Sequence, residues 1–67
     1  MQQVQAAVAL HNQGELDQAE AIYRQILAVD VNNFYALRFL GCICRLHGLY
    51  SEGIELLRRA VEVDSSN

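Results

Sequence analysis

Apolar residues recur at helical spacing in four segments of the chain. The segment 17–30 shows the pattern most clearly, with the 3.6-residue period of an amphipathic helix at Ala19, Ile22, Tyr23, Ile26, Leu27 and Val29. Comparable patterns predict helices over residues 2–13, 34–47 and 51–64. The connections between them are only a few residues long, so consecutive helices must pack as antiparallel neighbours. The sequence therefore predicts an all-α fold of four antiparallel helices.

Turn and cap residues separate the four segments. Gly14 suits the left-handed conformation that ends a helix. Asp17, followed three residues later by Glu20, predicts a capping box at the start of the second helix. An asparagine of the break at residues 30–33 is expected to cap the third helix, and Ser51 is the expected N-cap of the fourth. Inside the third helix, Gly41 lowers helix propensity by about 1 kcal/mol relative to Ala, so we expect another helix to pass close to it.

The two halves of the chain repeat each other with a shift of 34 residues. Gly14 aligns with Gly48, Arg24 with Arg58, and Asp30 with Asp64. A fixed period of this length is typical of stacked helical repeats. We interpret residues 1–67 as a single domain, with repeat one at 1–33 and repeat two at 34–67, and expect it to be a fragment of a longer array.

Composition and charge exclude several classes of function. The net charge is −3, from eight acidic residues against five arginines, whereas nucleic-acid binding needs a basic face. No apolar stretch approaches the ~18 residues of a membrane span, and the N-terminus lacks the basic region of a secretory signal. Cys42 and Cys44 lie roughly 200° apart on the third helix and cannot pair with each other. We therefore expect a reduced, cytoplasmic protein.

Candidate chemistry is sparse, and we predict no enzyme, cofactor or metal site. The two histidines, His11 and His47, each fall in the last turn of a helix, where a protonated imidazole interacts well with the helix dipole. Cys44 and His47 are one turn apart, but zinc needs three or four converging ligands, and Cys44 occupies a core position. Cys42 is the more exposed thiol. No catalytic triad or phosphate-binding loop is present.

The repeated positions resemble those of the tetratricopeptide repeat over essentially the whole chain. In the second unit they are Leu37, Leu40, Gly41, Cys44, Gly48, Tyr50, Gly53, Leu57, Ala60 and Asp64. In the first unit they are Ala6, Ala7, Leu10, Gly14, Leu16, Ala19, Tyr23, Ile26 and Asp30. The resemblance implies two tandem helix-turn-helix repeats in a right-handed α-solenoid. The stretch 19–27 also looks like repeats of bacterial proteins related to O-linked glycosyltransferases.

Two features depart from the family pattern. Gln3 stands where the family has a bulky residue, so the first helix is expected to be weakly anchored. Val31 and Ser65 stand where a proline usually ends each repeat. Because proline forbids helix continuation, its absence opens the alternative that the second and third helices merge through residues 30–33 into one rod, which is a route to domain swapping.

The resemblance also implies a peptide-binding groove lined by the first helix of each unit. The groove residues that it predicts are Tyr35, Arg38, Phe39, Cys42 and Arg45 in the second unit and Gln5 and Val8 in the first, with Val4 and Asn12 beside them. Arg38 and Arg45 are two turns apart on one face and could hold carboxylates of a partner. The alternative is a solvated arginine stripe next to an aromatic shelf.

The last helix carries a second candidate surface. A repeat buries its apolar face only against a neighbour, and no helix follows residue 64. Ile54, Leu57 and Val61 therefore cannot all be covered from within the chain, and Leu49, Leu56 and Val63 are further candidates for exposure. An uncovered apolar stripe marks an interface. We predict self-association through this helix, giving a homo-oligomer.

These observations favour a protein–protein interaction module, or scaffold, that binds a partner protein or peptide and self-associates. One alternative is a substrate-guiding repeat segment of a larger glycosyltransferase-like enzyme. Another is a purely structural or designed oligomerisation unit. The sequence does not name the partner.

Overall fold

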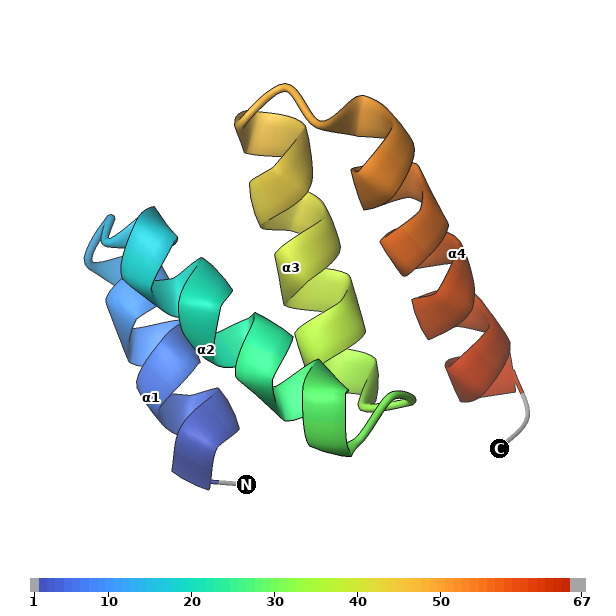
Figure 1. The fold of residues 1–67 in the computed structure, drawn as a ribbon, viewed down its shortest axis with the longest axis horizontal. Coiled ribbons are helices and arrows are strands. Elements are labelled where there is room, and N and C mark those ends of the chain that lie inside the picture. Colours follow the sequence, from blue (N-terminus) through green and yellow to red (C-terminus); the bar gives the residue numbers. More distant parts are fainter. Residues whose placement is uncertain (1, 66–67) are drawn as a thin grey trace.

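The computed structural model describes residues 2–65 and consists of four α-helices (Figure 1). The helices are α1 (Gln2–Asn12), α2 (Leu16–Val29), α3 (Phe34–Leu46) and α4 (Tyr50–Ser65). Each packs against the next along the chain, and α1 also touches α3. In Figure 1, α1 and α2 lie at one edge, α3 stands in the middle, and α4 lies beside α3 at the other edge. The predicted all-α fold of tandem helix-turn-helix units is confirmed.

The turns within the two units have the same construction. Gly14 and Gly48 adopt φ angles of 86° and 81°, in the left-handed region that side chains with a Cβ atom avoid. Between the units, α2 ends at Val29 and α3 begins at Phe34. The side-chain oxygen of Asn33 accepts a hydrogen bond of 3.0 Å from the backbone N–H of Ala36, which confirms the predicted asparagine cap and identifies the residue. The two helices are separate, and the alternative of one merged rod is not what the structure shows.

The predicted caps of α2 and α4 are wrong by two residues each. The N-cap of α2 is Glu15, which makes no side-chain cap bond, so Asp17 and Glu20 do not form a capping box. In α4 the backbone N–H of Gly53 already donates to the carbonyl oxygen of Leu49, which places Ser51 inside the first turn. Both helices begin early because the left-handed glycine reverses the chain, leaving one residue between it and the first helical residue.

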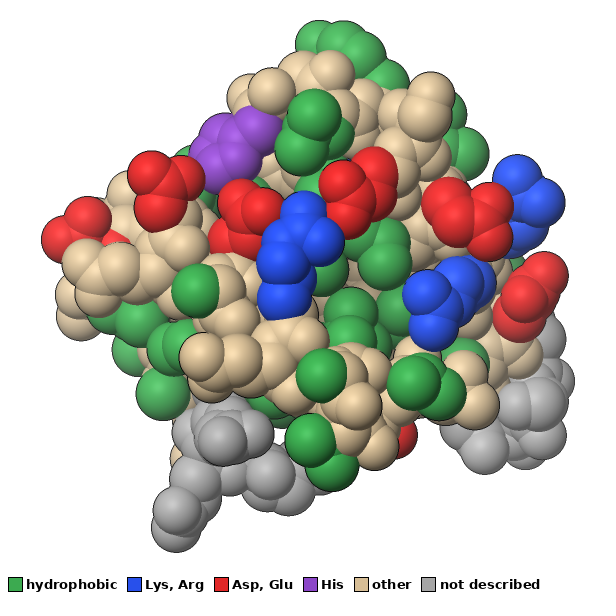
Figure 2. Space-filling model, viewed as in Figure 1, with side chains coloured by type: hydrophobic (Ala, Val, Ile, Leu, Met, Phe, Trp, Pro, Cys, Tyr) green, Lys and Arg blue, Asp and Glu red, His purple; other side chains and the backbone are tan. Residues whose placement is uncertain are grey.

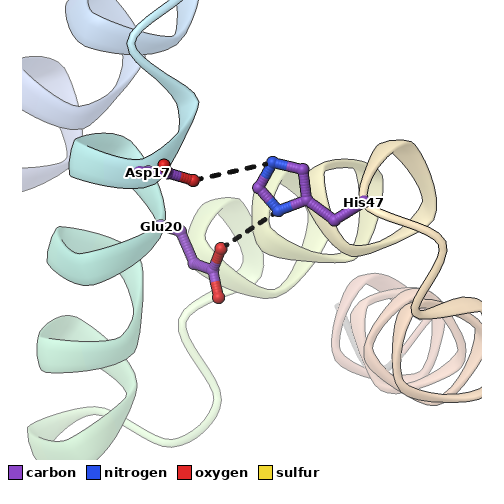
Figure 3. Close-up of side chains that lie close together, drawn as sticks. All are labelled: Asp17, Glu20 and His47. Atoms are coloured by element: carbon purple, nitrogen blue, oxygen red, sulfur yellow. Dashed lines mark ion pairs between the residues drawn. The ribbon is translucent and has the colours of Figure 1, made fainter.

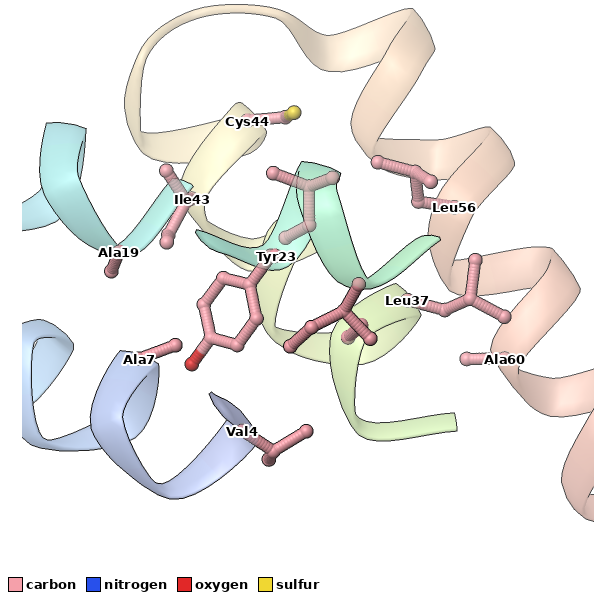
Figure 4. Packing of buried hydrophobic residues seen from close by; sticks show 12 residues of the cluster. Val4, Ala7, Ala19, Tyr23, Leu37, Ile43, Cys44, Leu56 and Ala60 are labelled. Atoms are coloured by element: carbon pink, nitrogen blue, oxygen red, sulfur yellow. The ribbon is translucent and has the colours of Figure 1, made fainter. Parts of the chain in front are cut away.

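The core joins all four helices. Its buried members are Val4, Ala7, Ala19, Tyr23, Ile26, Ala36, Leu37, Leu40, Ile43, Cys44, Leu56 and Ala60. Tyr23 is its largest side chain and is fully buried, with its hydroxyl group directed toward α1, where Val4 and Ala7 lie (Figure 4). The ring of Tyr23 stacks on that of Phe39, with centroids 5.9 Å apart. Tyr23 therefore connects the first unit to α3.

Burial changes the pKa of the Tyr23 hydroxyl group. The oxygen has no hydrogen-bond partner among the described residues. Because an ionised phenolate would lose its hydration there, burial, with a smaller contribution from the charge of Cys42, raises the pKa of Tyr23 to about 12.

Small residues set the distance between α3 and α4. A Cβ atom placed on Gly41 would lie 2.8 Å from Leu57 Cγ and 3.1 Å from the carbonyl oxygen of Gly53. One placed on Gly53 would lie 2.9 Å from the carbonyl oxygen of Gly41. The close approach predicted for Gly41 is confirmed, and Gly53 contributes to it equally.

The apolar residues of α4 face two directions. Leu56 and Ala60 are buried. Of the further candidates for exposure, Leu49 is exposed and Leu56 is not. Leu57 is half-buried because it packs over Gly41. Ile54 and Val61 are 57% and 63% exposed. The glycine contact turns the Leu56 side of the helix toward α3 and leaves the Ile54 side in solvent.

Candidate functional site

A hollow of about 650 Å³ lies between α1 and α3. Its lining residues come from the first helix of each unit and are Val4, Gln5, Val8, Ala9, Asn12, Tyr35 and Phe39. The lining contains aliphatic and aromatic side chains with two amides and no charged group. The hollow thus offers an apolar surface with a few polar groups, which is the usual character of a binding pocket.

Aromatic rings build the α3 wall of this hollow. Tyr35 lies 6.4 Å from Phe39, centroid to centroid, at an interplanar angle of 18°. Phe34 meets Tyr35 edge-on at 5.4 Å, and His11 of α1 meets Phe39 edge-on at 6.1 Å. Because Phe39 also stacks on the buried Tyr23, the wall is anchored in the core. The exposed part of this stack is Tyr35, at 48%.

The predicted groove residues separate into two groups. Gln5, Val8, Tyr35 and Phe39 line the hollow, together with Val4 and Asn12. Arg38, Cys42 and Arg45 do not line it. Ala9 also lines the hollow. Its position was not predicted, because an alanine in an amphipathic helix carries no chemical signal.

Arg38 stands at the edge of the aromatic wall. Its guanidinium carbon lies 5.9 Å from the centroid of the Phe39 ring, within the range of a cation–π contact. The side chain is exposed, and no carboxylate among the described residues is paired with it. Arg38 therefore presents an unused positive charge next to the apolar hollow.

Arg45 and Cys42 have different surroundings. The Cγ atom of Arg45 would lie 2.8 Å from a Cβ atom on Gly53, so its stem passes over the α3–α4 contact. Cys42 is half-buried on α3 and is a free thiol. Arg45 thus stands on the side of α3 that faces α4, whereas Arg38 lies beside the aromatic wall.

Ion pairs connect the two units on the face shown in Figure 2, where acidic and basic groups gather over α2 and α4. Arg24 of α2 donates to Glu20 on its own helix at 3.0 Å and to Glu52 of α4 at 2.9 Å. The bond to Glu52 is the main reason that the pKa of Arg24 is raised above its usual value. A further bond runs from Arg59 of α4 to the carbonyl oxygen of Val31, at 2.8 Å.

A second polar group lies where α2 begins and α3 ends. His47 Nδ1 is 3.4 Å from Glu20 Oε1, and His47 Nε2 is 3.8 Å from Asp17 Oδ1 (Figure 3). Their ligand-type atoms all lie within 4.8 Å of one another. The two carboxylates, however, approach different nitrogens of one ring, and Asp17 is 96% exposed. This is the geometry of an imidazole ring between two carboxylates rather than of ligands that converge on one ion.

Cys44 is not part of that group. It is fully buried, and its sulfur lies 4.0 Å from the guanidinium of Arg24. Burial raises the pKa of the Cys44 thiol, which keeps it protonated and unsuited to bind a metal. Its position in the core agrees with the packing role expected from the sequence.

Comparison with known protein families identifies the fold. The family model of the tetratricopeptide repeat matches residues 3–33, which span α1, α2 and the turn after them. The four helices together fit a helical repeat of this type. Residues 3–33 are thus recognised as a tetratricopeptide repeat. No significant match is found among the curated proteins or the solved structures. The likeness to repeats of glycosyltransferase-like proteins is not supported by any of these comparisons.

The match of residues 3–33 to the tetratricopeptide repeat has general consequences. Such repeats are protein-interaction modules and are typically non-catalytic scaffolds, which suggests a protein partner. Among residues 2–65, no helix combines the length and the apolar character needed to cross a membrane.

Proposed function

We propose that the chain binds a segment of a partner protein in the hollow between α1 and α3. The main support for this proposal is the hollow itself, in which Tyr35 and Phe39 of α3 face the valines of α1. Burying aromatic and aliphatic surface from a partner there would be favourable by about 25 cal/mol per Å² before the costs of association. A hollow without charged lining favours binding over reaction, and we infer that the module acts without catalysis.

The surroundings of the hollow indicate the chemistry of the partner segment. It should place a large apolar or aromatic side chain between Val8 and Tyr35. It should also carry an acidic residue that reaches Arg38, whose charge is not satisfied by a carboxylate of the described residues. A carboxylate that binds arginine gains from charge-assisted hydrogen bonds. Since both cysteines are free thiols, we further propose that the protein works in the reducing cytoplasm.

Selection from a random peptide library tests this proposal. Peptides selected on the immobilised chain should share an apolar or aromatic residue near an acidic one. Ala9→Glu places a charge in the lining of the hollow without removing a core side chain and should weaken their binding at least tenfold. Ala21→Glu is the matched control, because Ala21 is an exposed alanine of α2 that lies outside the hollow. Equal binding to both variants would refute the proposed site.

A second proposal concerns self-association through Ile54, Leu57 and Val61. It is supported by the exposure of Ile54 and Val61 on the outer face of α4. We expect a homo-oligomer that forms at micromolar concentration. Ile54→Lys should shift the chain to monomer in sedimentation, whereas Val29→Lys, at a valine that is 90% exposed on α2, should leave it unchanged. A stable monomer for the unmodified chain would contradict the proposal.

A further inference from the structure

Two side-chain amides stand on the α1 side of the hollow, opposite the aromatic wall of α3. They belong to Gln5 and Asn12, which are both exposed and both part of the lining. Neither side chain makes a hydrogen bond with another of the described residues. The hollow therefore offers free hydrogen-bonding groups on one side and aromatic rings on the other.

The helix that carries the two amides fixes their spacing. Gln5 and Asn12 are seven residues apart in α1, which is about two helical turns. They therefore lie on one face of the helix, about 10.5 Å apart along its axis. A segment that uses both amides must present two acceptor groups on one side at nearly this spacing.

This spacing distinguishes between the backbone conformations of a bound segment. In a polyproline II helix every third residue faces the same way, and three residues rise by about 9.3 Å. In a β-strand the carbonyl groups of one side recur after about 6.7 Å and about 13 Å, which misses the spacing of the amides by about 3–4 Å. An α-helix uses its carbonyl groups in its own hydrogen bonds. The polyproline II helix keeps its carbonyl groups free and fits the amides to about 1 Å.

Resting on the binding of a partner segment proposed above, we infer that this segment is rich in proline and binds as a polyproline II helix. Two of its backbone carbonyl groups, three residues apart, accept hydrogen bonds from the amides of Gln5 and Asn12. Prolines beside its apolar anchor residue pack on the rings of Tyr35 and Phe39, which are stacked at an interplanar angle of 18°. Proline-rich segments suit aromatic-lined grooves because their conformation is already formed, so little entropy is lost on binding.

The charges around the hollow set the composition of the segment further. No charged residue lines the hollow, so the part of the segment that enters it should be uncharged. Arg38 lies just beside the rings, with its guanidinium carbon 5.9 Å from the Phe39 centroid, and no described carboxylate is paired with it. An acidic residue should therefore flank the prolines, where its carboxylate accepts hydrogen bonds from Arg38.

Fluorescence anisotropy with the full chain and a labelled peptide tests the conformation of the segment. The probe has a central leucine, two prolines on each side of it and a glutamate at each end. A second peptide has valine in place of every proline, because valine stays apolar but favours a strand. The proline probe should bind at least tenfold more tightly than the valine peptide.

Two variants test the contacts with the amides. Gln5→Leu and Asn12→Leu each remove one amide and keep an apolar side chain of similar size. Each should lower the affinity for the proline probe about fivefold, which is the effect of one hydrogen bond, and the two together should lower it further. Gln25→Leu, at an exposed glutamine of α2 outside the hollow, is the matched control and should leave the affinity unchanged. Circular dichroism checks that all three variants keep their helices.

The outcomes separate this inference from the proposed function. Equal binding of the proline and valine peptides, or unchanged affinity in both amide variants, would overturn the inference. Library-selected peptides that still lose binding on Ala9→Glu would then keep the hollow as the site. If neither these peptides nor the proline probe responded to Ala9→Glu, the proposed site would be wrong as well.

Discussion

Gly41 of α3 and Gly53 of α4 face each other, each where a Cβ atom would lie about 3 Å from the backbone oxygen of the other. This pair brings the two helices of the second unit into close contact. It also decides which side of α4 is buried, since Leu56 and Ala60 then turn toward α3. Ile54 and Val61 lie on another side of α4 and stay exposed.

Gly41→Ala should destabilise the protein, although alanine is the better helix former by about 1 kcal/mol. The new methyl group would meet Leu57 Cγ at 2.8 Å and a backbone oxygen at 3.1 Å. Overpacking of this kind costs about 1–3 kcal/mol, measurable as a lower urea midpoint. In a Leu57→Ala background the cost should be smaller, because one of the two clashes is gone. A gain in stability from Gly41→Ala would show that the helices are not in close contact.

Tyr23→Phe should stabilise the protein. The substitution removes a buried hydroxyl group that has no hydrogen-bond partner among the described residues, and burying such a group costs about 1–3 kcal/mol. For a domain of this size, 1 kcal/mol corresponds to a Tm change of about 4–8 °C. Tyr35→Phe, at a half-exposed ring, is the control and should leave Tm nearly unchanged. A lower Tm for Tyr23→Phe would mean that the hydroxyl group is satisfied.

The stability of the unmodified protein should fall at alkaline pH because of the same residue. Its pKa is about 12 in the folded state and 10.0 as the reference value, so the folded state holds the proton more tightly. Between these values the unfolded chain releases a proton that the folded chain keeps, and the free energy of unfolding decreases as pH rises. In Tyr23→Phe this part of the fall in the free energy of unfolding should be absent, because residue 23 no longer carries a hydroxyl group that can ionise. Denaturant titrations at pH 9, 10 and 11 compare the two proteins.

Asn33→Ala should lower the free energy of unfolding by about 1 kcal/mol, because it removes the side-chain oxygen that caps α3. Asn32→Ala is the neighbouring control, since Asn32 is exposed and makes no cap bond. Chemical denaturation of the two variants measures the difference. Equal stability would show that the break between α2 and α3 does not depend on this cap.

Helical periodicity was enough to predict the four helices, the 34-residue repeat and the core position of Cys44. It was not enough to choose between two faces of α4. Leu56 and Ile54 are both apolar and both fit a helical stripe, and only the distance between Gly41 and Gly53 places Leu56 inside. Cap residues were misplaced because Asp17 and Ser51 are good caps by composition, whereas the helices begin where the left-handed glycines reverse the chain.

The sequence predicted only part of the hollow, because contacts between helices decide where some of the predicted groove residues lie. The residues of α1 and α3 that share its wall, such as Val8 and Phe39, follow from the family pattern. The position of Arg45 does not follow from that pattern. Its aliphatic side-chain atoms pack over Gly53 of α4, and the sequence pattern does not define this contact between helices. The family pattern and the seven-residue spacing selected Arg38 and Arg45 together, and the structure leaves Arg38 as the one beside the aromatic wall.

The central claim is that the hollow between α1 and α3 is the partner-binding site. The most direct measurement is methyl NMR of the full chain during titration with a selected peptide. The account predicts that the methyl signals of Val4 and Val8 shift, while those of Val29 on α2 and Val61 on α4 do not. Shifts centred on Val61, with Val4 and Val8 unmoved, would contradict it.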